Sequence, residues 1–186
     1  MQHSISVGMH QSTHATEPHP VFLVDGEPLN LWLSQQLSTF EINCKDHFFD
    51  VDTQNLITSE HGAYVHIQDL VPAQGWLIDD DDMKTAWRRI NPDGVGLTTI
   101  VPLLICPDDV DLTCIVFVVE QETSTDLIHW NRFGFAMDKP YDSVGATVQW
   151  SRKFHQVEFQ RSEYCTALIS FQALCGETWI QNECFQ

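Results

Sequence analysis

The segment from residue 98 to residue 150 constrains the fold most strongly, because four β-rich stretches follow one another with only short turns between them. Parallel neighbours in a sheet need a crossover of a dozen or more residues, and no turn here is that long. The segment therefore predicts consecutive antiparallel strands in a meander. The four expected strands are residues 99–105, 114–120, 128–137 and 146–150.

The first two of these stretches, VPLLIC and CIVFVV, are almost uniformly apolar. A strand with one solvated face would alternate between apolar and polar residues. We therefore predict that these two strands are central and covered on both faces.

A helix is expected on either side of the meander. Asp residues suit the start of a helix, where backbone N–H groups lack partners, and residues 79–82 are four aspartates. Gly176 is expected to end the second helix, which Ser162 would cap. The predicted buried faces comprise Met83, Ala86, Trp87 and Ile90 in the first helix, and Tyr164, Leu168, Phe171 and Leu174 in the second.

The N-terminal part carries weaker patterns. Residues 1–20 are polar and predict a flexible tail, which leaves residues 21–186 as a single domain. Asp25-Gly26 predicts a tight hairpin, and a helix should follow from about Asn30. The C-terminal residues 177–186 contain large apolar side chains and are expected to pack on the domain. The predicted fold class is α+β: an antiparallel meander of about four to six strands with helices packed on it.

The charge of the chain restricts its partners. Nine Lys and Arg residues against 26 Asp and Glu residues give a formal net charge of −17. Such a chain lacks the basic face that nucleic-acid phosphates require, so we expect no nucleic-acid partner. No apolar run is long enough to span a membrane, and the N-terminus has no secretory pattern, which predicts a cytoplasmic protein with no membrane contact. A basic protein is the expected partner.

The six cysteines include no Cys-x-x-Cys pair and no zinc-finger spacing. We therefore expect no metal and no cofactor, and we interpret the cysteines as small apolar residues in a reducing compartment. Cys106 and Cys114 face each other across the expected hairpin, so a disulfide between them is a minor alternative.

Asp108, Asp109 and Asp111 lie between the two apolar stretches. Residues 109–113 read Asp-x-Asp-x-Thr, which resembles the nucleophile loop of haloacid-dehalogenase-type phosphatases. That loop follows a parallel strand near the start of a large domain, whereas here a predicted antiparallel strand follows at once. A calcium loop counted from Asp109 would need glycine where Cys114 stands. Both motifs are therefore poor matches, and the chain has no other coherent catalytic set.

A resemblance adds to this interpretation. The segments DLVPAQGWL, AWRRI, VPLLICPDDVDLTCIVFVVE, HWNRFG and VGATVQW, within residues 69–174, resemble small acidic bacterial proteins of unassigned function. The profile is similar to the immunity proteins of polymorphic-toxin systems. The resemblance implies a protein that neutralises a toxin by binding it, and it supplies no catalytic residue.

The leading hypothesis is thus a non-enzymatic acidic binding protein, with an immunity protein as its narrower form. The alternatives are a divalent-metal-dependent hydrolase centred on Asp108, Asp109 and Asp111, or a structural subunit that self-associates into a homo-oligomer. The acidic helix entry and the acidic loop are expected to lie near each other and to bind the partner. The candidate partner-binding residues are Asp79, Asp80, Asp81, Asp82, Asp108, Asp109 and Asp111.

Overall fold

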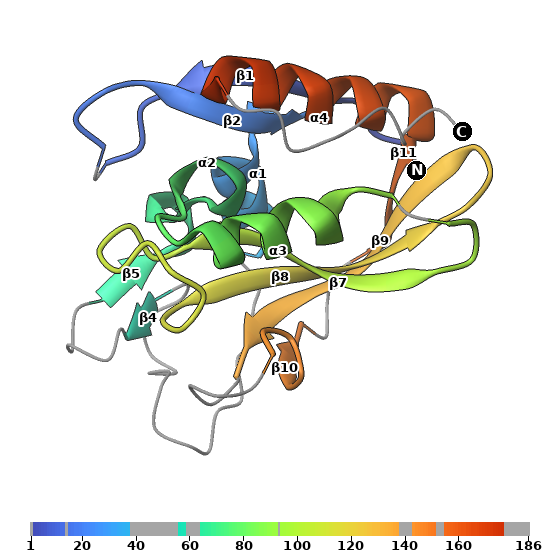
Figure 1. Cartoon of the computed structure of the whole chain (residues 1–186). Helices are drawn as coiled ribbons and strands as arrows, with labels where there is room; N and C mark the ends of the chain where they lie inside the picture. The colour runs from blue at the N-terminus through green and yellow to red at the C-terminus, as the bar shows by residue number, and fades with distance from the viewer. Residues whose placement is uncertain are drawn as a thin grey trace.

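The computed structural model describes residues 2–13, 15–37, 56–58, 64–92, 94–137, 143–151 and 155–176. Over these residues the chain has an α+β fold, as predicted (Figure 1). The strands of the larger sheet are β6 (Val71–Pro72), β7 (Thr98–Ile105), β8 (Val116–Thr123), β9 (Leu127–Ala136), β10 (Val148–Trp150) and β11 (Val157–Gln160). Their order is β10-β9-β8-β7-β6, and β11 pairs with another part of β9.

The predicted meander is confirmed, because β7, β8, β9 and β10 are consecutive antiparallel neighbours. Residues 101–105 of β7 and residues 116–119 of β8 are buried without interruption. Successive side chains of a strand point to opposite faces, so continuous burial means that both faces are covered there. The central position predicted for these two strands is therefore confirmed.

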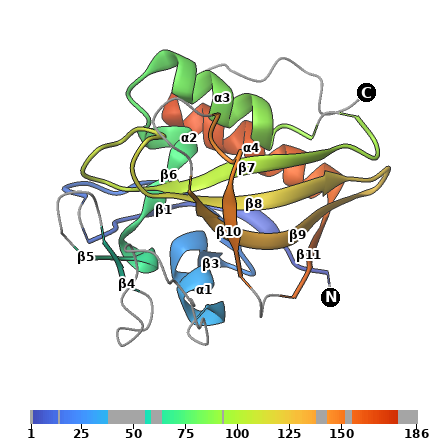
Figure 2. The same ribbon diagram turned by 90° about the horizontal axis from the view of Figure 1, so that it is seen from below.

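Three helices accompany this sheet: α2 (Ala73–Trp76), α3 (Asp80–Ile90) and α4 (Arg161–Cys175). In both views α3 and α4 lie on the same side of the sheet (Figures 1 and 2). Helix α3 starts within the run of aspartates, with Asp79 as its N-cap, and buries all four residues of its predicted face. The rings of Trp87 on α3 and Phe171 on α4 meet edge to face, with centroids 5.8 Å apart.

Two details predicted for α4 are wrong. The N-cap is Gln160 rather than Ser162, because β11 runs directly into the helix and the Arg161 N–H donates to the Asp126 carbonyl at 2.8 Å. Leu174 is 53% exposed. Cys175 faces α2 instead of Leu174. Its Sγ lies close to Gly75, since a Cβ atom added to that glycine would be 3.4 Å from the sulfur. Gly176 ends the helix in the left-handed conformation, as expected.

The flexible tail predicted for residues 1–20 is wrong where strands form. The strands β1 (Ile5–His10), β2 (His19–Val24) and β3 (Glu27–Pro28) make a three-stranded antiparallel sheet beside α4. Ile5 pairs with Val24 and is buried. The short alternation of residues 5–9 is a weak strand pattern alone, and its stability here comes from pairing with β2 and packing on α4.

The hairpin predicted at Asp25-Gly26 is confirmed, since both residues have positive φ (52° and 83°) and connect β2 to β3. Helix α1 (Leu29–Gln36) follows, one residue before the predicted start. Short elements then lead to the larger sheet: β4 (Leu56–Thr58), β5 (Tyr64–His66) and the 3-10 turn η1 (Ile67–Asp69). The predicted packing of residues 177–186 lies outside the described residues. None of the helices described here is long and apolar enough to cross a membrane.

One polar side chain joins the layers. Gln121 on β8 is 2% exposed, and its Oε1 accepts hydrogen bonds from Trp130 Nε1 at 3.2 Å and the Tyr164 hydroxyl at 2.6 Å. Its Nε2 donates to the Ile90 carbonyl at 3.2 Å, at the end of α3. The amide thus connects β8 to β9, α3 and α4.

We predict that Gln121→Leu lowers the free energy of unfolding by about 2–4 kcal/mol, because buried partners lose their hydrogen bonds. Tyr164→Phe should cost only about 1 kcal/mol, since Trp130 still satisfies the amide oxygen. The measurement is urea denaturation at neutral pH. The control is Gln156→Leu, at an exposed glutamine, which should stay within about 0.5 kcal/mol of the parent. Equal stability of Gln121→Leu and the control would contradict the role of this amide.

Candidate functional site

The start of α3 carries the first group of predicted site residues. Asp79 is the N-cap, and its Oδ1 accepts the backbone N–H groups of Asp81 at 2.9 Å and Asp82 at 3.1 Å. These bonds satisfy two of the unpartnered donors at the helix start. Asp80 and Asp81 are exposed, and Asp81 lies 3.3 Å from Lys84 Nζ. The cap is therefore structural, whereas the two following carboxylates face solvent.

The second group lies on the loop between β7 and β8, residues 106–115, which we call the acidic loop. The Val110 N–H donates to the Cys106 carbonyl at 3.2 Å and turns the chain back on itself. Val110 has φ of 48°, an uncommon conformation for a β-branched residue. The Asp111 Oδ1 accepts the Thr113 N–H at 2.8 Å and the Thr113 hydroxyl at 2.9 Å. Asp111 thus shapes its own turn.

The structure brings these two groups together. The Leu112 N–H donates to Asp82 Oδ2 at 3.2 Å, and the Ile78 N–H donates to the Val110 carbonyl at 3.3 Å. In Figure 1 the acidic loop accordingly passes beside the start of α3. We call the combined surface the acidic face. Its residues are Asp79, Asp80, Asp81, Asp82, Asp108, Asp109 and Asp111.

Asp82 lies at the junction of the two segments and is only partly exposed. Burial raises the pKa of its carboxyl group above the ordinary value of 3.8, and the charges of Asp79, Asp111 and Asp81 raise it further. The hydrogen bond from Leu112 opposes this shift without cancelling it. The carboxyl group of Asp82 is therefore harder to ionise than an ordinary aspartate, because it is partly buried among other carboxylates.

The seven predicted residues differ in what they can do. Asp79, Asp82 and Asp111 hold the local backbone, so their side chains are already engaged. Asp80, Asp81 and Asp108 are exposed. The alternative hydrolase centre needs Asp108, Asp109 and Asp111 to converge. Among the described residues, the three ligand-bearing groups that meet instead are those of Cys106, Asp109 and Cys114.

This second cluster lies at the base of the acidic loop. The two Sγ atoms and a carboxylate oxygen of Asp109 all lie within 4.8 Å of one another. Cys106 is buried, whereas Cys114 and Asp109 are half-buried. Both cysteines are free thiols that share a hydrogen bond, so the alternative disulfide is not formed in this structure.

The surroundings of the two thiols are unequal. The hydrogen bond with Cys114 lowers the pKa of Cys106 to about 6, against the effect of burial, and the backbone N–H groups of Asp108 and Asp109 lower it further. The same thiol pair, burial and the Asp109 carboxylate raise the pKa of Cys114. The hydrogen bond between the two thiols therefore favours ionisation of Cys106 over ionisation of Cys114.

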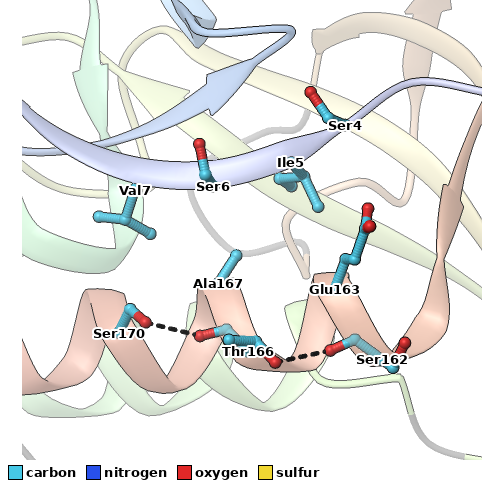
Figure 3. A pocket seen from close by; sticks show the side chains of 9 residues that line it. All are labelled: Ser4, Ile5, Ser6, Val7, Ser162, Glu163, Thr166, Ala167 and Ser170. Carbon is cyan, nitrogen blue, oxygen red and sulfur yellow. Dashed lines mark hydrogen bonds between the residues drawn. The ribbon is translucent and has the colours of Figure 1, made fainter.

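A groove of about 510 Å³ lies elsewhere, between β1 and α4 (Figure 3). The hydroxyl groups of Thr166 and Ser170 donate to carbonyls of the preceding helix turn, each at 2.8 Å. Those hydroxyls are therefore already engaged within α4. The lining residues are Ser4, Ile5, Ser6, Val7, Ser162, Glu163, Thr166, Ala167 and Ser170, and none is a predicted site residue.

Sequence reasoning recognised Cys106 and Cys114 as opposite residues of a hairpin but did not place Asp109 beside them. The available signal was a pair of cysteines at the two ends of one loop with carboxylates between them, which differs from the short spacings of common metal motifs. Comparison of the chain with models of known protein families, with curated proteins and with solved structures found no match.

We predict that Asp79→Ala lowers the free energy of unfolding by about 1 kcal/mol, since two backbone donors lose their acceptor. Asp79→Ser should retain most of the stability because its hydroxyl also caps. The neighbouring Asp80→Ala serves as the matched control and should change stability by less than about 0.5 kcal/mol. Urea denaturation of the three variants gives the comparison, and equal losses at both positions would contradict the capping role.

A second prediction concerns pH. The folded pKa of Asp82 is raised, so its contribution to stability is greatest below the unfolded value of 3.8 and is lost as pH rises through the folded pKa. Asp82→Asn keeps an oxygen for the Leu112 N–H and removes the charge. The variant should therefore gain stability relative to the parent between pH 4 and pH 7. Denaturant unfolding at several pH values measures this, and a parent that gains relative to the variant would reverse the sign.

Proposed function

We propose that this chain is a non-enzymatic binding protein whose acidic face recognises a basic partner. The observation that carries the proposal is the junction of α3 and the acidic loop, where hydrogen bonds from Leu112 to Asp82 and from Ile78 to Val110 unite two acidic segments. Without this junction the aspartates would lie on two separate solvated segments of the chain. With it the two acidic segments lie side by side.

Electrostatics supports this function. A net charge of −17 generates a long-range field that attracts a basic protein, and a concentrated acidic face orients it. Charge complementarity of this kind mainly raises the association rate and the specificity. Burial is the main cause of the raised pKa of Asp82, and repulsion from the neighbouring carboxylates raises the pKa further. A basic side chain of the partner would relieve that repulsion.

The narrower form of the proposal is an immunity protein that neutralises a basic toxin in the same cytoplasm. The acidic composition and the resemblance of residues 69–174 support this form. Its partner would be a secreted toxin encoded beside it, with a basic surface of matching size.

The exposed residues Asp80, Asp81 and Asp108 are those that a partner would contact. Asp79, Asp82 and Asp111 hold the backbone, and Asp109 lies beside the two thiols. The first experiment is affinity capture from the native host with the immobilised full chain at about 0.05 M and about 0.5 M salt. We expect a basic protein that is retained at low salt and released at high salt. Recovery of no partner with this salt dependence would contradict the proposal.

The second experiment measures the association rate of the captured partner by surface plasmon resonance. The triple variant Asp80→Asn/Asp81→Asn/Asp108→Asn should bind at least about tenfold more slowly. Its matched control is Glu17→Gln/Asp126→Asn/Glu163→Gln, which removes three exposed charges outside the acidic face.

The control variant should keep the association rate within about threefold of the parent, because the charges that it removes lie outside the acidic face. The two variants change the net charge equally. Equal rates for the two triple variants would show that net charge, and not the acidic face, governs binding.

A further inference from the structure

We propose that Cys106, Cys114 and Asp109 form a zinc site at the base of the acidic loop. This inference is independent of the proposed function, because it rests on the interior of the loop and not on its exposed carboxylates. It also departs from the expectation that the chain holds no metal, which was based on sequence spacing alone.

The geometry of the three side chains fits a metal ion. Their ligand atoms, two sulfurs and one carboxylate oxygen, all lie within 4.8 Å of one another. Tetrahedral zinc with bonds of about 2.0–2.3 Å separates its ligand atoms by about 3.4–3.8 Å. Side-chain rotations that move these atoms by about 1 Å would therefore bring them to coordination distance.

The backbone preorganises this arrangement. The Cys106 N–H donates to the Ile115 carbonyl at 3.0 Å, which places the two ends of the loop side by side and Cys114 next to Cys106. The bond from the Val110 N–H to the Cys106 carbonyl then folds the loop back over the buried sulfur. Asp109 lies within that folded turn, so its carboxylate reaches the two thiols.

Groups around the ligands would support coordination. The backbone N–H groups of Asp108 and Asp109 are hydrogen-bonded to the Cys106 sulfur. The Asp111 carboxylate accepts the Cys114 N–H at 3.3 Å and fixes the backbone that carries the second thiol. Such outer contacts orient the first ligands of metal sites and tune their affinity.

The donor set selects the metal. Two thiols favour zinc over the hard cations magnesium and calcium, which prefer oxygen ligands. Each thiol would release its proton to solvent on coordination, so binding should weaken at low pH. Cys114 and Asp109 are half-buried, which gives an ion a path from solvent to the buried Cys106. Three protein ligands leave a fourth position for water or for a group from outside the chain.

The test uses the full chain, reduced with a phosphine and freed of metal by a chelator. Zinc is titrated in competition with a chromophoric chelator, and cobalt(II) is added to a separate metal-free sample as a spectroscopic probe. We expect one equivalent of zinc per chain and a sulfur-to-cobalt charge-transfer band with tetrahedral ligand-field bands. Zinc should also raise the thermal midpoint of unfolding.

Variants separate this site from zinc bound elsewhere. Cys114→Ser should weaken zinc binding at least about 100-fold and Asp109→Asn at least about tenfold, since each removes a ligand. Both residues are half-buried, so the variants should fold, and circular dichroism verifies this. Cys175→Ser changes a half-buried cysteine on α4 and should bind zinc as the parent does.

Three results would overturn the proposal. The first is the absence of stoichiometric zinc binding by the reduced parent. The second is unchanged zinc affinity in both Cys114→Ser and Asp109→Asn, which would place the ion at other residues. The third is a cobalt complex without the sulfur charge-transfer band.

Discussion

The side-chain amide of Gln121 lies among apolar residues at the centre of the larger sheet, where an unpaired polar group is costly. It avoids that cost because Trp130, Tyr164 and the Ile90 carbonyl supply all its observed partners. These partners come from β9, α4 and α3, so the bonds form only when the sheet and both helices are in place. The Gln121 amide therefore has all these hydrogen bonds only when both helices are correctly placed on the sheet.

The acidic face depends on that placement. Asp79 caps α3 whatever the rest of the chain does, but Asp82 reaches the Leu112 N–H only because α3 packs along β7 and the acidic loop leaves the end of that strand. Three of the seven aspartates, Asp79, Asp82 and Asp111, consequently serve the local backbone. The negative charge of the acidic face is concentrated because the packing of α3 and the acidic loop holds these aspartates close together. Three of the carboxylates in this face are exposed to solvent, namely those of Asp80, Asp81 and Asp108.

The same loop has two chemically different sides. Its outer side carries carboxylates, while its inner side carries two thiols and Asp109. Asp109 belongs to both groups in the sequence, but the folded turn directs it toward the thiols. A loop of ten residues thus separates exposed carboxylates from a compact set of potential metal ligands.

The sequence by itself determined the meander, both long helices and the Asp25-Gly26 hairpin, because uniform apolar stretches, helical spacing and turn residues act over a few positions. It also predicted that the two acidic segments lie near each other, which the hydrogen bonds of Leu112 and Ile78 bear out. Only the tertiary structure decided the strand at residues 5–10, the partners of Gln121 and the meeting of Asp109 with the cysteines. These features depend on contacts between segments distant along the chain, or on how a loop closes, and no local pattern encodes either of them.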